Sequence, residues 1–141
     1  MREASSHEER LSKLDLFAGL SRKQLKKLAK RSQVVEHQPG RTIAAEGLGA
    51  LAFHLILEGE ATVSHGSETI RTLGADDYFG EISIIDGKPR SVTVAASSPL
   101  RTLVVPHQVF QNLLDSEPTF ARELLTLLCT RVREAESRLS S

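Results

Sequence analysis

The sequence predicts a mainly β domain with helices at both ends. Between about residues 36 and 106, short apolar runs alternate with Gly and Asp turn residues, a pattern typical of antiparallel strands. On either side of this region the apolar residues recur at helical spacing. A length of 141 residues suits one domain with one core. We therefore expect a single domain over 1–141, with N-terminal helices over about 1–35 and C-terminal helices over 107–141.

The first part of the chain predicts two helices. Residues 5–17 carry one apolar stripe and are expected to form a short helix that Gly19 ends. Ser21 is a favourable N-cap for a second helix reaching about Arg31. The basic run Arg22–Arg31 is spaced like the solvated face of that helix.

The middle of the chain predicts several short strands. Glycine and aspartate clusters divide it, and a break at Glu58–Glu60 interrupts the longest run. The segments with strand character are 41–47, 50–66, 68–80, 90–96 and 100–106. Such a succession predicts an antiparallel sandwich or barrel.

The last part of the chain predicts two more helices. Residues 107–118 form the first, which should close near Pro118 because the residue before a proline disfavours helix. Residues 119–139 form the longest periodic segment of the chain. Its apolar positions are Phe120, Leu124, Leu127, Leu128, Val132 and Leu139.

Bulk composition excludes several classes of partner. Lys plus Arg equals Asp plus Glu at 18 each, so no global field attracts nucleic acid or an acidic membrane. No apolar run approaches the roughly 18 residues of a membrane span, and residues 1–10 do not resemble a signal peptide. The single cysteine, Cys129, cannot form an internal disulfide. We expect a soluble cytoplasmic protein with no nucleic-acid and no membrane partner.

One apolar stretch, "YFGEISIIDGKPRSVTVAA", holds two opposite charges, Glu81 and Arg90. Charged side chains are rarely buried unless they are paired. Gly80 permits an unusual backbone angle or the close approach of a ligand, and a carboxylate suits the first turn of a helix. We therefore expect one short helical turn over 80–85, followed by a tight turn over 86–89.

This arrangement suits a particular kind of ligand. The first turn of a helix presents free N–H groups, and a nearby arginine adds two parallel donors that match phosphate oxygens. A serine hydroxyl adds a further donor. A carboxylate repels an anion but accepts hydrogen bonds from hydroxyl groups beside it. A cyclic nucleotide, with one cyclic phosphate and a free ribose 2′-OH, has both features.

The segment "FGEISIIDGKPRSVTVAA" resembles the phosphate-binding cassette of cyclic nucleotide-binding domains, here residues 79–92. That family includes catabolite activator proteins, kinase regulatory subunits and nucleotide-gated channels. The segments "FAGLSRKQLKKLAKRSQVVEHQPGRTI" and "FHLILEGEATV" are similar to its first helix and central strands. The resemblance implies an eight-stranded antiparallel jelly-roll barrel flanked by N-terminal helices and two C-terminal helices. It also implies a regulatory domain and not an enzyme.

The resemblance assigns roles to individual residues. It implies that Arg90 pairs with the cyclic phosphate and that Glu81 accepts the ribose 2′-OH. It implies that the other phosphate and ribose contacts come from Gly80, Ile82, Ser83 and Ser91. It further implies that Val63 and Ile70 line the base pocket and that Arg131, on the last helix, caps the base. The ligand would be cAMP or cGMP, with cAMP favoured by its frequency in the family, and no cofactor is implied.

The sequence leaves structural alternatives open. Val63 and Ile70 could be ordinary core residues, and Arg131 could be a solvated helix charge. The pair Asp76–Asp77 departs from the Gly-Asp that the family often has before the cassette aromatic. Aspartate tolerates left-handed backbone angles better than most residues, so the turn should survive.

The function also has an alternative. The chain could be a ligand-silent protein-interaction module of the same fold, whose last helix packs on an unknown effector or on its own copy. An enzyme is disfavoured because the five His are scattered without metal-ligand spacing. Transcription factors of the family append a helix-turn-helix after the last helix, whereas this chain stops at Ser141. We therefore expect an effector protein or self-association, and no contact with DNA.

Overall fold

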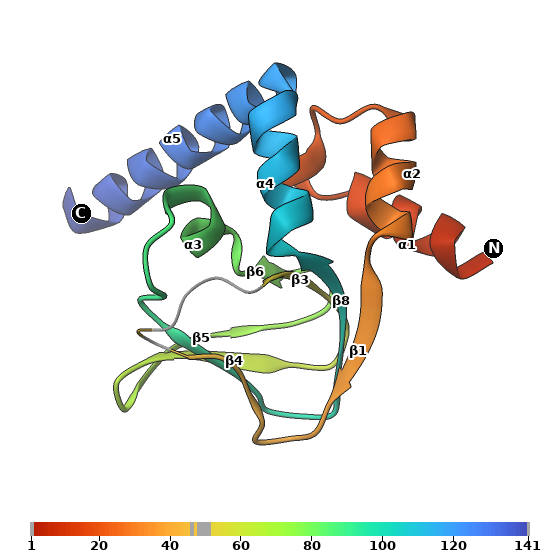
Figure 1. The fold of residues 1–141 in the computed structure, drawn as a ribbon. Helices are drawn as coiled ribbons and strands as arrows, with labels where there is room; N and C mark the ends of the chain where they lie inside the picture. Colours follow the sequence, from red (N-terminus) through yellow and green to blue (C-terminus); the bar gives the residue numbers. More distant parts are fainter. Residues whose placement is uncertain (1, 46, 48–51, 141) are drawn as a thin grey trace.

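The computed structural model describes residues 2–45, 47 and 52–140, and it shows a β core with helices gathered at one end (Figure 1). The strands fill the lower part of the view in Figure 1, while the N-terminal and C-terminal helices lie together above them. The mainly β architecture with flanking helices predicted from the sequence is confirmed. Within the described residues, no helix combines the length and the apolar character needed to cross a membrane.

The strands form two antiparallel sheets. The first has the order β1-β8-β3-β6 and the second the order β2-β7-β4-β5. The bounds of the strands are β1 Gln33–His37, β2 Thr42–Ala44, β3 Ala52–Glu58, β4 Ala61–His65, β5 Glu68–Leu73, β6 Tyr78–Phe79, β7 Thr93–Ala96 and β8 Leu100–Pro106. The expectation of one closed barrel is corrected, since within the described part of the chain no hydrogen-bonded ladder joins the two sheets. The predicted beginning of the third strand, at residues 50–51, lies outside the described residues.

Strand β3 lies between the two parts of the core. Successive side chains of a strand point to opposite faces of the sheet. Phe53 and Leu55 accordingly join the cluster under the helices, whereas Ile56 joins the cluster between the sheets. This burial on both faces explains why the sequence of β3 is a nearly continuous apolar run.

The helices agree with the predicted ranges except at the first. Their bounds are α1 Arg2–Ser12, the 3-10 helix η1 Asp15–Phe17, α2 Arg22–Lys30, α3 Glu81–Asp86, α4 His107–Ser116 and α5 Pro118–Ser140. The predicted helix over 5–17 was wrong beyond Ser12. The Ser12 hydroxyl donates 2.6 Å back to the Glu9 carbonyl, and Leu14 adopts an extended backbone. Both features end α1, and the chain then turns into η1.

Helix α2 begins as the sequence predicts. The Ser21 Oγ accepts from the Gln24 N–H at 3.2 Å, and the Gln24 Oε1 accepts from the Ser21 N–H at 2.7 Å. This reciprocal capping box satisfies two backbone donors that the first helical turn would otherwise leave unpaired.

The helical layer is built around four aromatic rings. Phe17, Phe53, Phe110 and Phe120 have neighbouring ring centroids 5.5–6.3 Å apart and are almost fully buried. The first half of α5 covers this cluster, and Leu124 is buried with it. The second half extends over α3 (Figure 1), where Val132 and Leu139 are exposed.

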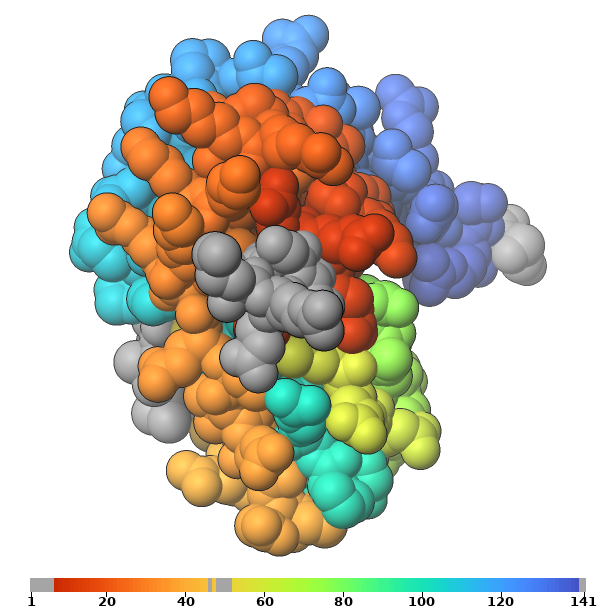
Figure 2. All heavy atoms as spheres, turned by 90° about the vertical axis from the view of Figure 1, so that its right-hand side faces the viewer, coloured from red at the N-terminus to blue at the C-terminus, as the bar shows by residue number. Residues whose placement is uncertain are grey.

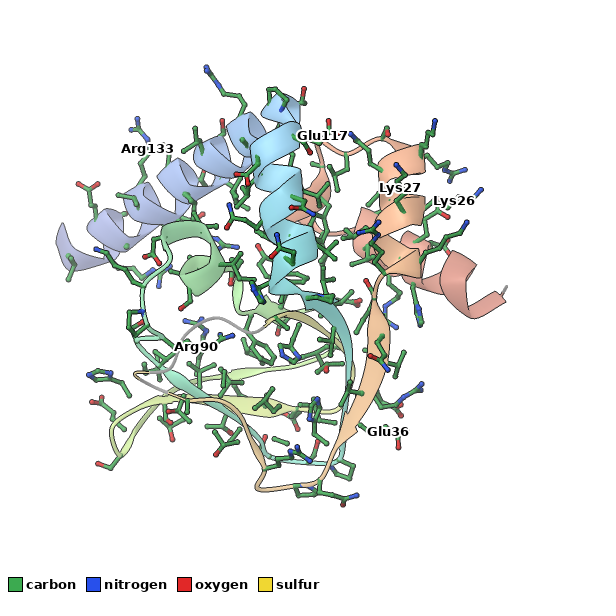
Figure 3. All side chains as sticks on the ribbon, in the orientation of Figure 1. Lys26, Lys27, Glu36, Arg90, Glu117 and Arg133 are labelled. Carbon is green, nitrogen blue, oxygen red and sulfur yellow. The ribbon has the colours of Figure 1, made fainter. Side chains whose placement is uncertain are left out.

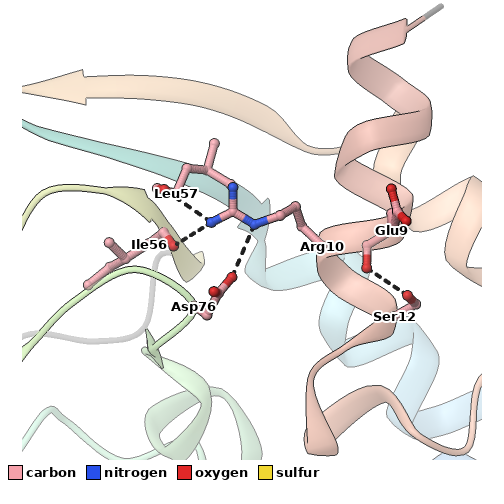
Figure 4. A network of polar contacts seen from close by, with 6 residues as sticks. All are labelled: Glu9, Arg10, Ser12, Ile56, Leu57 and Asp76. Atoms are coloured by element: carbon pink, nitrogen blue, oxygen red, sulfur yellow. Dashed lines mark hydrogen bonds and ion pairs between the residues drawn. The ribbon is translucent and has the colours of Figure 1, made fainter.

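Helix α1 is tied to the turn that precedes the predicted cassette. Figure 4 shows Arg10 reaching the Asp76 carboxylate, with Nε and Oδ1 3.1 Å apart. The same guanidinium donates to the Leu57 carbonyl at 3.0 Å and to the Ile56 carbonyl at 3.4 Å. Asp76 has φ 73°, so the expected left-handed backbone at this aspartate is present. The aspartate therefore forms the turn and also anchors α1.

Candidate functional site

A cavity of about 980 Å³ lies between the second sheet, the segment 79–92 and helix α5. Its walls include side chains from β4, β5 and the residues before η1, so distant parts of the chain meet there. Most of the site residues expected from the sequence line it: Val63, Gly80, Glu81, Ile82, Ser83, Arg90, Ser91 and Arg131. Ile70 is not among the lining residues.

Gly80 sets the start of the cassette. Its φ of 101° lies in the left-handed region that favours glycine. A Cβ added there would lie 2.4 Å from the Ala52 carbonyl oxygen, far inside van der Waals contact. The backbone of β3 therefore approaches the cassette so closely that only glycine fits between them.

Helix α3 is the short turn predicted for residues 80–85. It ends at Gly87, which has φ 70°, and the Asp86 carboxylate accepts from the Lys88 N–H at 2.9 Å. Ile84 is buried in the core under the helices, and Ile85 packs against that core. Contacts of α3 with α4 and β3 fix its orientation, and they direct the Glu81 side chain into the cavity.

Glu81 is buried and forms an ion pair with helix α5. Its Oε2 lies 3.3 Å from the Arg131 Nη1, and only 6% of the residue is exposed. Burial raises the pKa of the Glu81 carboxyl, and the nearby Arg131 guanidinium offsets only part of that rise. Removing Arg131 would therefore leave a buried carboxyl with a still weaker preference for its ionised form.

The ion pair continues into a chain of polar contacts. The Arg131 Nη2 donates to the Tyr78 hydroxyl, and this hydroxyl donates to the Asp15 Oδ1 at 3.0 Å. Burial raises the pKa of the Tyr78 phenol, so the phenol stays protonated and able to donate. Helix α5, β6 and η1 are thereby connected through the cavity wall to α3.

Arg90 approaches the same cavity from the other end of the cassette. Figure 3 labels it below α3 and above the strands of the second sheet. Its Nη2 donates to the Ala52 carbonyl at 3.3 Å, and among the described residues it forms no ion pair. Burial lowers the pKa of Arg90, while Glu81 acts to raise it. A guanidinium has five donors, and the described residues engage only one of those of Arg90, which leaves donors that an anion in the cavity could use.

The remaining predicted residues divide between the cavity and the surface. Ser91 lines the cavity, and its carbonyl lies 3.0 Å from the His65 Nδ1. Val63 is buried and pairs in register with Arg71, and both line the cavity. Ile70 precedes Arg71 on β5, so its side chain points to the opposite face of the strand, where it is half exposed.

Several lining residues were not predicted from the sequence. Tyr78 and Arg71 adjoin predicted positions and could have been found from the spacing of the strands. Asp15, by contrast, reaches Tyr78 across 63 positions of sequence, and no local pattern signals that contact. Further charges at the cavity come from Lys13, Glu134 and Arg138.

Beside the cassette, a buried histidine pair joins the strands of the first sheet. The Thr102 Oγ1 lies 3.0 Å from the His37 Nε2 and 3.2 Å from the His54 Nδ1. A hydroxyl carries one proton and two acceptor lone pairs, so it donates to at most one of the two rings and accepts from at least one of them. The His54 ring stacks on Phe79, with centroids 4.8 Å apart. This network supports the residue directly before Gly80.

The histidine pair predicts a stability change with pH. Burial lowers the pKa of His54 to about 3, with further contributions from His37 and Arg90, and it also lowers the pKa of His37. The unfolded chain takes up these protons near pH 6.5, whereas the folded chain does not. The contribution of the two neutral histidines to the free energy of unfolding is therefore fully present above about pH 6.5, and it is lost as the pH falls below that value. For His54 alone we expect a loss of about 1.4 kcal/mol between roughly pH 7.5 and 5.5.

Urea unfolding across this pH range measures the effect. His54→Phe keeps an aromatic ring against Phe79 and removes the titrating group, so its stability should fall less steeply towards acid. If the free energy of unfolding fell equally with pH in the unmodified protein and in His54→Phe, His54 would not be buried in its neutral form.

Within the described residues, no group of three or more His, Cys, Asp or Glu side chains is placed to hold a metal ion. The chemistry of the cavity instead rests on guanidinium, carboxylate and hydroxyl groups. These groups can bind an anion and the hydroxyl groups that accompany it.

Comparison with known proteins identifies the family. Residues 34–117 match the family described as "Cyclic nucleotide-binding domain", and this match runs from the second residue of β1 to the residue after α4. The chain belongs to that family. The match contains the whole segment 79–92 with Glu81 and Arg90.

Individual relatives include a protein kinase and a transcriptional regulator. It is 34% identical over 128 residues to a cGMP-dependent protein kinase from Eimeria tenella, covering 90% of this chain and 12% of the kinase. It is 26% identical to the CRP-like cAMP-activated global transcriptional regulator of Mycobacterium tuberculosis, covering 94% of this chain and 62% of the regulator. The chain therefore spans less than two thirds of the length of these relatives.

A solved structure has the same fold. The sensor domain of the transcriptional regulator DNR from Pseudomonas aeruginosa superposes with a TM-score of 0.84 at 22% identity, covering 97% of this chain and 95% of that chain. The likeness extends to the flanking helices, because almost the whole of both chains is covered.

Proposed function

We propose that this domain is a cyclic nucleotide sensor that prefers cAMP to cGMP and transmits binding to its C-terminal helices. One observation carries the proposal: Glu81 and Arg90 line the same large cavity from the two ends of the segment 79–92. A guanidinium with spare donors and a buried carboxylate match the phosphate and the 2′-OH of a cyclic nucleotide.

Each part of the ligand has a candidate partner. Arg90 would form parallel hydrogen bonds with the cyclic phosphate, and Ser91 would add its hydroxyl. The backbone N–H groups of Ile82 and Ser83, in the first turn of α3, would complete the phosphate and ribose contacts. Glu81 would accept the ribose 2′-OH. Val63 on β4 and Arg131 on α5 would enclose the base, and the absence of Ile70 from the cavity wall leaves it out of this set.

The preference for cAMP rests on its frequency in the family and not on the cavity. The regulator from M. tuberculosis is named as cAMP-activated and the kinase from E. tenella as cGMP-dependent, so both nucleotides occur among similar proteins.

The single, exposed Cys129 supports a location in the reducing cytoplasm.

Isothermal titration with cAMP and cGMP, run side by side, tests the proposed function. We expect saturable binding of both, with the lower dissociation constant for cAMP. Tighter binding of cGMP would overturn the preference alone. No heat and no thermal stabilisation with either nucleotide would favour the alternative, a protein-interaction module that has lost its ligand.

Movement of α5 has a separate test, because Cys129 is an exposed cysteine and the only one in the chain. An environment-sensitive fluorophore on Cys129 should change its emission when cAMP binds. Arg131 connects α5 to Glu81, so in Arg131→Ala the signal change should be strongly reduced even at saturating cAMP. Arg133→Ala, an exposed cation two positions away, is the matched control and should respond as the unmodified sequence does. An equal response in all three proteins would show that Arg131 does not transmit binding.

A further inference from the structure

Helix α2 presents a surface of positive charge only. None of its residues is among those that line the nucleotide cavity. Between Asp15 and Glu36 the sequence contains no acidic residue and six basic ones: Arg22, Lys23, Lys26, Lys27, Lys30 and Arg31. All six are exposed, and Figure 2 shows α2 as an orange ridge across this face of the molecule. The whole chain has no net charge, so the rest of it carries six more acidic than basic residues.

Part of this surface is unfavourable for the helix that carries it. Arg22 and Lys23 lie in the first turn, where the helix dipole favours acidic side chains. Four pairs of like charge lie four positions apart, and such pairs destabilise a helix. Among the described residues only Arg22 is near a carboxylate, with its Nε 3.9 Å from the Glu8 Oε1. Lys27 and Lys30 lie in the last turn, where the dipole favours cations, so only part of the charge opposes the helix. A surface of six cations with so few carboxylate partners is suited to an anionic partner.

A groove lies beside these charges. A cavity of about 220 Å³ between α2 and α4 has apolar walls formed by Leu28, Val109 and Leu113. Lys27 and Arg31 line it from α2, while α4 and its C-cap contribute Asn112, Ser116 and Glu117. Figure 3 labels Lys26 and Lys27 on α2 and Glu117 at the end of α4. The groove therefore combines an apolar base with a cationic side and a mainly polar side.

We infer that this groove binds an acidic peptide segment of a partner protein, with one apolar side chain inserted between α2 and α4. Carboxylates on the segment would face Lys27, Arg31 and the other cations of α2, which is complementary in charge. The apolar side chain would fill the base, as an anchor residue does in peptide recognition. The inference concerns a surface separate from the nucleotide cavity and does not depend on the proposed ligand.

Two other anionic partners fit less well. A membrane surface requires apolar side chains that insert beside the charges, but the large exposed apolar residues among those described are Ile70, Ile82, Leu125, Val132 and Leu139, none of them on α2 or α4. Single-stranded nucleic acid requires aromatic side chains for base stacking, and the groove has none.

Fluorescence anisotropy tests the inference with a labelled peptide that has one central leucine flanked by glutamates. The full chain should bind this peptide saturably, and binding should weaken as the salt concentration rises. The double variant Lys27→Glu/Arg31→Glu should raise the dissociation constant at least about tenfold. The matched control, Arg122→Glu/Arg133→Glu, makes the same charge change on exposed residues of α5 and should bind as the unmodified chain does.

A second variant separates the groove from general charge attraction. Asn112→Trp leaves every charge in place and fills the groove from its exposed side. The unmodified chain should prefer the leucine peptide to one with a central serine, and Asn112→Trp should bind the two equally. The inference is overturned if the peptide fails to bind at about 1 mM, if both charge-reversal variants lose affinity equally, or if the leucine gives no advantage. Tighter binding to phosphatidylserine vesicles or to a single-stranded oligonucleotide would overturn it too.

Discussion

Arg90→Ala is expected to weaken cAMP binding by more than about 2 kcal/mol, which is roughly thirtyfold or more in the dissociation constant. The phosphate of a bound nucleotide would lie in a cavity where water is partly excluded. Loss of the guanidinium leaves that phosphate desolvated and unpaired, which costs more than the net gain from the original contact. Isothermal titration of the two proteins with cAMP measures the difference.

The free protein should tolerate the same change. Within the described part of the chain, Arg90 makes one side-chain hydrogen bond, to the Ala52 carbonyl, so the melting temperature without ligand should change little. Lys88→Ala removes a cation from the same cavity wall at an exposed position, and it should leave most of the affinity. Glu81→Ala should weaken binding less than Arg90→Ala, because its partner on the ligand is a neutral hydroxyl. Unchanged affinity in Arg90→Ala would contradict the assignment of the phosphate site.

Gly80→Ala is expected to destabilise the folded protein by about 2 kcal/mol or more. Two effects add at this position. The φ of 101° is strained for any residue with a Cβ, and that Cβ would lie 2.4 Å from the Ala52 carbonyl oxygen. The Ala52 carbonyl belongs to the backbone of β3 and cannot move without disturbing its sheet. Urea unfolding measures the loss of stability.

Gly87→Ala is the matched control for this change. Gly87 ends the same helix with φ 70°, but a Cβ there has no neighbour within 4 Å. Its replacement should cost about 1 kcal/mol of left-handed strain and no steric penalty. Equal stability losses at the two positions would mean that the close approach between β3 and the cassette is absent in solution.

The ion pair between Glu81 and Arg131 also indicates which contact a nucleotide must share or displace. The Glu81 carboxylate is already paired with Arg131 at 3.3 Å. A ribose 2′-OH would have to share or replace this contact, so in the proposed function ligand binding and the position of α5 would be coupled through this carboxylate. The apolar contacts of Ile84 and Ile85 with the helical core provide a second connection to the helices.

Much of the site was accessible from sequence because its signals are local. Gly80, Glu81 and Arg90 lie within eleven positions. Few structures explain why an apolar stretch should contain a glycine, an acidic residue at a helix start and an arginine together. The short helix α3 and the turn at Gly87 follow from the same residues. Helix α2 was predictable because its Ser21 cap is encoded in neighbouring residues.

The parts that sequence could not provide depend on long-range contacts. The Tyr78–Asp15 hydrogen bond and the anchoring of Arg10 on Asp76 join segments more than sixty positions apart. The resemblance placed Ile70 at the cavity, but the sequence does not show which face of β5 its side chain occupies. Most side chains of β5 are exposed, so no alternation of apolar and polar residues marks the face that points to the cavity. The early end of α1 arose from a Ser12 side chain that bonds to its own helix.

A crystal structure of the full chain grown with cAMP tests the central claim most directly. The account predicts the nucleotide in the large cavity, its phosphate oxygens within hydrogen-bond distance of the Arg90 guanidinium, and its ribose 2′-OH on the Glu81 carboxylate. A nucleotide bound elsewhere on the molecule, or one in the cavity that contacts neither of these side chains, would contradict it.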